Sequence, residues 1–344
     1  MSYRTTDYFP APAAVHDRTP ETSFPKEPSK QPQVDFIGNS PAIREIYSMI
    51  QVVSDSTTAI LITGESGTGK DVVARLIHSR SPRADQPFIA INCAAVPRDV
   101  FENELFGHER GAFTGAIARK AGYLEMANSG TLFLDELAEM NPDTQAKLLR
   151  VIETKSYIRL GGTSEIKVDV RMLAATNKDV PAAIASGELR KDLYYRFSVL
   201  ELRLPPLRER KEDIPLLVDH FLRSLCEKHD RSPKVFSGEV MEALTNYEWP
   251  GNIRELKNVV ERAVLLSPAD VVPLKYLPPE ISKSTPRHDH IVTIPLGTKL
   301  RSAEKDIILE TLSSVDNNKS KAASVLGLSR KALYNKLRRF GALK

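Results

Sequence analysis

The stretch that most constrains the fold of this chain is an apolar run that breaks into a glycine-rich loop and is followed by a helix. Residues 59–62 predict a buried strand, and the amphipathic stretch from Asp71 to Ser79 predicts a helix. The loop between them, GESGTGKD, matches the phosphate-loop pattern G-x-x-x-x-G-K-[ST] at every fixed position except the last. Backbone N–H groups, the positive end of the helix and the lysine all favour phosphate oxygens there. We therefore predict a nucleotide-phosphate site formed by Gly64, Glu65, Ser66, Gly67, Thr68, Gly69, Lys70 and Asp71.

A second motif supports this site against the alternative of a glycine-rich turn with a surface lysine. The sequence TLFLDE at 131–136 predicts a short buried strand with two carboxylates at its end, as in a Walker B motif. Asp135 would hold Mg²⁺, directly or through water, and Glu136 would polarise the attacking water. The alternative for this motif is an acidic helix cap before Leu137. One departure needs an explanation, since Asp71 replaces the hydroxyl that normally helps to hold the metal.

The order of apolar runs predicts the fold class. Runs at 88–92, 168–177 and 202–207 predict further strands, and helices are expected between the strands. This alternation is typical of an α/β fold with a doubly wound parallel sheet. Ligands bind at the carboxyl ends of such strands, so we expect Asn177 beside the phosphates. From Lys211 the periodicity is helical throughout, which predicts a small helical domain after the sheet.

Residues 104–116, ELFGHERGAFTGA, show neither helical nor strand periodicity. They place one bulky aromatic, Phe113, among small residues. A phenylalanine at the tip of a flexible loop is unfavourable in water, so it either packs into the core or contacts a partner. The residues alone leave these two alternatives open.

Bulk composition indicates a soluble globular protein. The chain has 344 residues, of which 41% are hydrophobic and 27% charged, enough for two or three packed domains. No apolar run approaches the roughly 18 residues of a membrane span, and the first thirty residues lack the apolar core of a signal peptide. We expect a cytoplasmic protein with no membrane partner. Cys93 and Cys226 cannot form a disulfide framework and are interpreted as structural thiols.

The two ends of the chain differ from the middle. Residues 1–33 are proline-rich with few aliphatics, which predicts a disordered tail. Residues 283–299 form a Pro/Ser/His-containing linker. Residues 287–344 then hold 12 lysines and arginines against 5 acids, whereas the rest of the chain is net acidic. The basic end should therefore be the nucleic-acid end.

The basic end predicts a helix-turn-helix. We expect three helices, at about 300–313, 319–326 and 329–340, with Ala323 and Gly327 at the tight turn. Leu333, Leu337 and Phe340 form the apolar stripe of the third helix. The alternative is a solvated basic bundle. The predicted contacts to double-stranded DNA are Lys319, Lys321, Ser329, Arg330, Lys331, Tyr334, Asn335, Lys336, Arg338 and Arg339.

Taken together, these stretches resemble the sigma-54-dependent transcription activators (bacterial enhancer-binding proteins), which are AAA+ ATPases. The resemblance runs from about Asp35 to Pro279 and resumes over 300–344, where it is to the Fis-type helix-turn-helix. Its most specific part is GAFTGA, which in this family is the loop that contacts sigma-54; here it is Gly111, Ala112, Phe113, Thr114, Gly115 and Ala116. An acidic residue normally follows the loop lysine in the family, so Asp71 does not indicate an inactive ATPase.

The resemblance also implies roles that the residues alone do not give. Asn92 matches the residue that restrains the catalytic glutamate, Asn177 matches sensor I and Arg254 matches the sensor II arginine. Arg190 and Arg196 match arginine fingers that reach a neighbouring subunit's ATP. Their six-residue spacing puts them on different helical faces, so from the residues alone a solvated basic helix is the alternative.

The implied protein is an ATP- and Mg²⁺-dependent ring, dimer to hexamer, that binds upstream DNA and remodels the sigma-54 RNA polymerase holoenzyme. We expect a tail at 1–33, an AAA+ α/β part at 34–206, a helical lid at 207–282, the linker at 283–299 and the DNA-binding domain at 300–344. Such a short tail cannot be the receiver domain of many relatives, so we expect a receiver-less type, with a separate regulator as a further partner. The rival from another class is a nucleotide-sensing DNA-binding repressor; a replication initiator or unfoldase is disfavoured because neither needs GAFTGA.

Overall fold

A computed structural model describes residues 36–282, 297–315 and 318–340 of the chain. The predicted disordered tail at 1–33 and most of the predicted linker at 283–299 lie outside these residues. No helix in the described ranges is both long and apolar enough to cross a membrane.

The centre of the α/β part is a five-stranded parallel sheet with the strand order β2-β5-β8-β1-β9. This confirms the predicted fold class. Three of the strands, β2, β5 and β8, lie within the predicted runs, although the strand expected from 168 starts only at 171. The first strand ends one residue later than its predicted run, and the last strand starts one residue earlier. The strands are β1 (Ile60–Thr63), β2 (Phe88–Asn92), β5 (Thr131–Asp135), β8 (Arg171–Thr176) and β9 (Glu201–Arg203).

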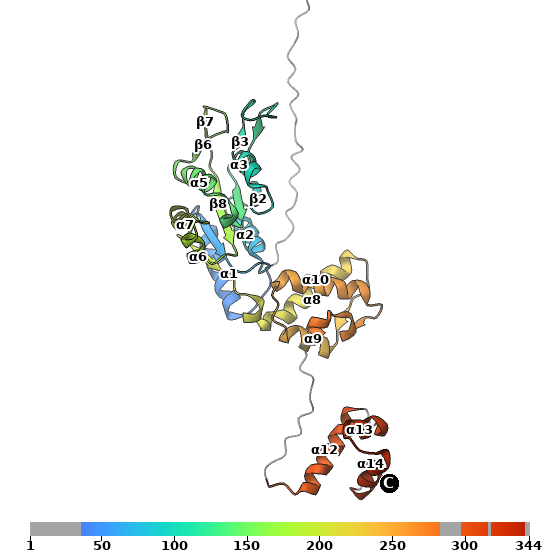
Figure 1. Cartoon of the computed structure of the whole chain (residues 1–344). Helices are drawn as coiled ribbons and strands as arrows, with labels where there is room; N and C mark the ends of the chain where they lie inside the picture. The colour runs from blue at the N-terminus through green and yellow to red at the C-terminus, as the bar shows by residue number, and fades with distance from the viewer. Residues whose placement is uncertain (1–35, 283–296, 316–317, 341–344) are drawn as a thin grey trace, which may run out of the picture. The chain divides into compact units, whose positions relative to one another are not determined.

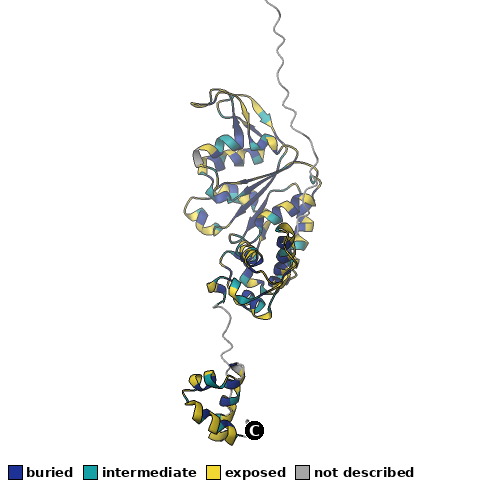
Figure 2. Ribbon diagram, turned by 90° about the vertical axis from the view of Figure 1, so that its right-hand side faces the viewer, coloured by how far each residue is buried: buried dark blue, intermediate teal, exposed yellow. Residues whose placement is uncertain are grey.

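Helices cover both faces of the sheet because successive strand residues point to opposite sides. Ile60 and Ile62 of β1 pack with α1 (Pro41–Ser54) and α2 (Lys70–Ser79). Leu61 belongs to the core on the other face. That second core includes residues of α3 (Arg98–Phe106), α4 (Tyr123–Met126), α5 (Pro142–Thr154), α6 (Val180–Ala185) and α7 (Lys191–Phe197). Figure 2 shows the buried strands running between more exposed helices.

The strand register aligns the carboxyl ends of four strands at one edge. Asn92 of β2 lies opposite Asp135 of β5. Thr63, the last residue of β1, lies opposite Thr176, the last residue of β8. The phosphate loop follows Thr63, so the carboxylates and the loop share this edge.

The GAFTGA sequence lies in an insertion between α3 and α4. Its neck is the antiparallel pair β3 (Gly107–His108) and β4 (Lys120–Ala121). A second antiparallel pair, β6 (Ser156–Ile158) and β7 (Glu165–Lys167), follows α5. Leu160, just after β6, exchanges backbone hydrogen bonds with Gly107 and Glu109, so the two insertions are tied together.

The segment after the sheet forms a helical lid with its own core around the fully buried Trp249. Figure 1 shows α8, α9 and α10 grouped together. The expectation of helix throughout is wrong at two dipeptides, β10 (Val235–Phe236) and β11 (Val271–Val272), which pair in parallel because the helices bring them together. The helical elements are η2 (Leu207–Glu209), η3 (Lys211–Asp213), α8 (Ile214–Lys228), α9 (Gly238–Asn246), α10 (Asn252–Leu266), η4 (Leu274–Tyr276) and α11 (Pro279–Ser282).

The C-terminal part has the three predicted helices, α12 (Leu300–Ser314), α13 (Lys319–Val325) and α14 (Arg330–Arg339). Their bounds lie within one residue of the prediction. Ala323 is buried and Gly327 has φ +64°, as the tight turn requires. Leu333 and Leu337 bury the apolar stripe of α14 in a small core of its own.

Candidate active site

Lys70 lies at the start of α2, with its ammonium group held over the phosphate loop. Its Nζ donates to the carbonyl oxygens of Gly64 (2.9 Å) and Glu65 (3.2 Å). The side chain is only 6% exposed, and this burial lowers the pKa of Lys70, while Glu136 opposes the shift. A buried cation that is satisfied by carbonyl oxygens is ready to exchange them for phosphate oxygens.

The two carboxylates at the end of β5 lie beside this lysine. Oε1 of Glu136 is 3.8 Å from Nζ of Lys70, and its Oε2 accepts a hydrogen bond from the backbone N–H of Asn177 (3.0 Å). Glu136 has φ +57°, a strained value for a residue with a side chain. Burial raises the pKa of both Asp135 and Glu136, and Lys70 lowers it. A glutamate with a raised pKa is a stronger base, which suits proton abstraction from water.

The structure brings Asn92 to Asp135 and not to Glu136, the contact that the resemblance implied. Its Nδ2 donates to Oδ2 of Asp135 (3.1 Å), and its Oδ1 accepts from the N–H groups of Ala94 and Ala95. The reason is the register, since Asn92 lies opposite Asp135 across the β2–β5 pair. Glu136 is held instead by the backbone of Asn177.

The donor set at this edge fits Mg²⁺. Magnesium takes oxygen ligands and is commonly bound by one or two carboxylates together with substrate phosphates. Asp135 is half-buried at the strand end, where burial raises its pKa and the negative charge of Asp71 adds to the shift. A divalent cation would relieve this repulsion.

The lid contacts the phosphate loop through residues that the sequence analysis did not identify. Arg208 forms two hydrogen bonds to the carboxylate of Glu65, and Asn252 also donates to it (3.2 Å). Glu65 therefore points to the lid and not into the phosphate space. Arg254, the predicted sensor II arginine, donates to Oγ of Ser66 (2.9 Å). No local pattern could have revealed these pairs, because the partners lie more than 140 residues apart.

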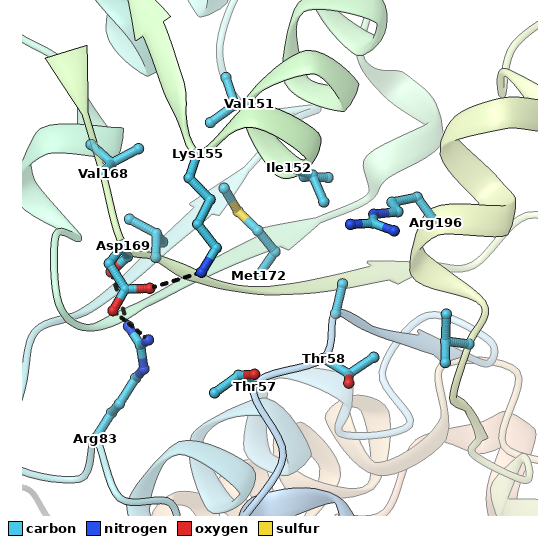
Figure 3. Close-up of a pocket in the computed structure, with 13 residues that line it drawn as sticks. Thr57, Thr58, Arg83, Val151, Ile152, Lys155, Val168, Asp169, Met172 and Arg196 are labelled. Atoms are coloured by element: carbon cyan, nitrogen blue, oxygen red, sulfur yellow. Dashed lines mark hydrogen bonds and ion pairs between the residues drawn. The ribbon is translucent and has the colours of Figure 1, made fainter.

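Arg190 and Arg196 lie away from the phosphate loop of their own chain. Arg190 is the N-cap of α7 and pairs with Asp192 at 2.6 Å. Arg196, in the last turn of α7, lines a cavity of about 580 Å³ together with Thr58 and Val199 (Figure 3). The cavity is lined by residues that precede β1, β8 and β9, at the opposite end of the sheet from the carboxylates.

Phe113 lies at the surface, which decides between the two alternatives left by the sequence. Its side chain is 46% exposed, and its ring packs in a T-shaped arrangement with the His108 ring, with the centroids 5.0 Å apart. Thr114 is also exposed, and a side chain added at Gly111 or Gly115 would meet nothing within 4 Å. The loop therefore presents an aromatic side chain and a hydroxyl on a free tip.

Most of the predicted DNA contacts are exposed in the C-terminal part. Ser329 caps α14 by accepting from the N–H of Ala332, and Lys319 lies over the ring of Tyr334. Lys336 differs from the expectation, because it pairs with Glu304 of α12 and so stabilises the domain itself. The exposed side chains are Lys321, Ser329, Arg330, Lys331, Tyr334, Asn335, Arg338 and Arg339.

Three family models match consecutive parts of the chain. The model described as Sigma-54 interaction domain matches residues 36–203. That of the AAA+ ATPase lid domain matches 208–293, and that of the bacterial regulatory protein, Fis family, matches 299–340.

Similar proteins agree with these matches. The chain is 45% identical over 311 residues to regulatory protein AtoC of Escherichia coli (strain K12), covering 89% of this chain and 68% of that protein. It is 41% identical over 354 residues to the DNA-binding transcriptional regulator NtrC of Azospirillum brasilense, covering 94% and 73%. The crystal structure of NtrX from Brucella abortus with ATP has a TM-score of 0.68 and 37% identity, covering 89% of this chain and 70% of that chain.

Proposed function

The chain belongs to the family of sigma-54-dependent transcriptional activators, and we propose that it opens promoters by remodelling the sigma-54 RNA polymerase holoenzyme in a ring of identical subunits. It is an AAA+ ATPase that binds DNA through a Fis-type helix-turn-helix. The observation that carries the proposal is the exposed Phe113 on a free loop, in the same domain as a buried ATPase centre. A nucleotide switch without mechanical output would not need such a tip.

We assign hydrolysis to the edge where β1, β5 and β8 end. The inward N–H groups of the phosphate loop and the Lys70 ammonium would hold the ATP phosphates. Mg²⁺ at Asp135 would neutralise charge on the phosphates. Glu136 would accept the proton of the attacking water. The hydrogen bond from Asn177 to Glu136 and the one from Asn92 to Asp135 would orient the two carboxylates.

Arg190 and Arg196 would act on the ATP of a neighbouring subunit. Both lie away from their own phosphate loop, so a role in cis has no geometric support. A guanidinium supplied in trans stabilises the charge of the phosphoryl transition state. This requires an oligomer that closes on itself, and a hexamer formed from dimers is the assembly we propose.

The remaining partners follow from the two outer parts of the molecule. The exposed side chains of α14 would read upstream sites in the major groove, with Asn335 at base edges and Arg338 at phosphates. We place the protein in the cytoplasm with the polymerase and propose that a separate regulator restrains its ATPase.

The test is transcription in vitro from a sigma-54 promoter, with purified protein, ATP and holoenzyme. We expect open complexes that require ATP and are lost in Thr114→Ala. A protein that binds the upstream sites and hydrolyses ATP, yet never opens the promoter, would favour the repressor. Arg338→Ala serves as the matched control, because it should weaken DNA binding at all sites about equally and keep ATP hydrolysis.

A further inference from the structure

Four consecutive residues of the phosphate loop, 65–68, are each bonded to the lid or to the segment that leads into it. The Glu65 carboxylate binds Arg208 at 2.6 and 2.8 Å. The carbonyl oxygen of Ser66 accepts from Asn252 (3.0 Å) and that of Gly67 accepts from the N–H of Ile253 (2.9 Å). The carbonyl oxygen of Thr68 accepts from Arg210 (3.1 Å). Because all four residues are bonded in this way, the loop forms a docking surface for the lid. We call residues 65–68 the latch.

The latch uses only the variable positions of the phosphate-loop pattern. Gly64, Gly69 and Lys70 are the fixed positions, and the hydrogen bonds to the lid all come from the four residues between them. Gly67 has φ +79°, and a Cβ there would lie 2.4 Å from the carbonyl oxygen of Gly251. The glycine at this position therefore serves the close approach of the lid.

Lid docking also sets the direction of the phosphate-binding N–H groups. In a planar trans peptide, the carbonyl of one residue and the N–H of the next point in opposite directions. The carbonyls of Ser66, Gly67 and Thr68 point to lid donors. The N–H groups of the three residues that follow them must then point the other way, toward the space in which phosphates bind.

The lid side of the latch is built to stay in place. Asn252 is fully buried with φ +51°, and its Oδ1 accepts from the N–H of Leu207 while its Nδ2 reaches the loop. Arg210 is 1% exposed, and two of its nitrogens have no partner among the described residues. Its buried guanidinium therefore depends on the hydrogen bond to the carbonyl oxygen of Thr68. The hydrogen bonds from Arg208 lower the pKa of Glu65 to about 2, so the pair stays charged at physiological pH.

We propose that the latch makes Glu65 and Arg208 positioning residues for ATP: their pairing docks the lid, and the docked lid holds the loop N–H groups in their phosphate-binding direction. The inference rests on the proposed function in taking this loop as the ATP site. Neither residue touches nucleotide in this scheme. Loosening the latch should therefore weaken ATP and ADP alike and leave the hydrolytic step in bound ATP nearly unchanged.

The experiment compares Glu65→Gln, Arg208→Gln and the double variant in the full chain. Each single change should weaken binding of a fluorescent ADP analogue about three- to tenfold, because a partly exposed charged pair contributes modestly. The KM for ATP should rise by a similar factor while kcat changes less than twofold. The matched control is Asp219→Asn, which removes an exposed lid pair with Arg223 on α8 and does not touch the loop.

Two readouts can overturn the latch. If Glu65 acts only through Arg208, the double variant is no weaker than the weaker single variant, and Arg208→Lys restores part of the affinity. Multiplicative losses would mean that Glu65 and Arg208 act independently of each other, and the proposal would fail. Hydrogen exchange of the Ile253 N–H should quicken in both single variants and not in Asp219→Asn; unchanged exchange in the single variants would also contradict the proposal. ADP affinity does not depend on promoter opening, so failure of the proposed function would be seen separately.

Discussion

The molecule holds two glycine-rich loops whose glycines have the same kind of backbone angle and opposite surroundings. In the phosphate loop, Gly67 has φ +79° and its missing Cβ would strike the backbone of Gly251 at 2.4 Å. In the GAFTGA loop, Gly111 has φ +82° and a Cβ there would meet nothing within 4 Å. Gly67 is required by the close approach of the lid backbone, whereas Gly111 is required only by the positive φ of its turn.

The difference separates the two tasks of the domain. The phosphate loop is fixed from outside, by the lid, and is therefore preorganised for a ligand of fixed shape. The GAFTGA loop is held at its neck and at Glu109 and Ala112, which contact the β6–β7 insertion, whereas Phe113 and Thr114 remain exposed at its tip. Changes in the first loop should alter chemistry, and changes in the second should alter output. ATP hydrolysis and promoter opening, measured side by side, can test this division.

Glu136→Gln should have the largest effect on hydrolysis. The change keeps the size of the side chain and its contact with Asn177, and it removes the general base. We expect ATP to bind while kcat falls by about 10²–10⁴-fold, measured as phosphate release. Open complexes should be lost with it. Near-normal turnover would show that another group activates the water.

Gly67→Ala and Gly111→Ala form a matched pair of variants, and the next largest effect should be on the ADP affinity of the first. The first adds a methyl group against backbone at positive φ, and local strain of about 1–3 kcal/mol should weaken ADP binding roughly ten- to a hundredfold. The second adds the same methyl group in open space, so ADP affinity should change less than twofold. Equal losses would contradict the comparison, and circular dichroism of both variants checks that they fold.

The pH dependence of hydrolysis should show a smaller effect, which also concerns the phosphate-binding edge of the domain. Burial raises the pKa of Glu136 above its ordinary value of 4.5, so the base is protonated, and activity lost, at a higher pH than for an exposed glutamate. Glu65 behaves oppositely, because its pKa of about 2 keeps it ionised. As the pH is lowered from about 7.5, we expect kcat to fall before the affinity for ADP does. A parallel fall in ADP affinity would implicate the lid contact instead.

Phe113→Ala should have the smallest effect on hydrolysis and still abolish output. The ring is exposed and packs against the His108 ring, and neither residue belongs to the ATPase centre, so ATPase activity should stay within about twofold. We expect no open complexes and no sigma-54 bound in the presence of a transition-state analogue. Wild-type promoter opening by this variant would assign the loop a structural role.

The sequence predicted those features that short stretches determine. Strands of a parallel sheet are short apolar runs, so the run Phe88–Asn92 predicts the bounds of β2, and the helices of the C-terminal part are predicted to within one residue. The carboxylates of the Walker B motif directly follow such a run, so the prediction of the strand also placed them at the edge of the sheet.

Features that depend on distant partners could not be predicted. Glu65 looked like part of the phosphate cradle, because nothing near it in the chain indicates Arg208 or Asn252. Asn92 was expected to hold Glu136, but strand register gives it to Asp135. The strands β10 and β11 are two residues each, too short for periodicity, and exist because the lid helices align them.

The neck of the GAFTGA insertion makes the loop an exchangeable part. A Cβ on Gly107 or Gly122 would lie 2.4 Å from backbone of the facing segment, so the two ends of the insertion touch where it leaves the domain. A loop that starts and ends at one point can change length without moving the sheet. Its closure costs only about 0.6 kcal/mol more for each doubling of length. Substitutions and insertions in this loop could therefore change the partner on which the ATPase acts, without any change in the sheet or in the ATPase centre.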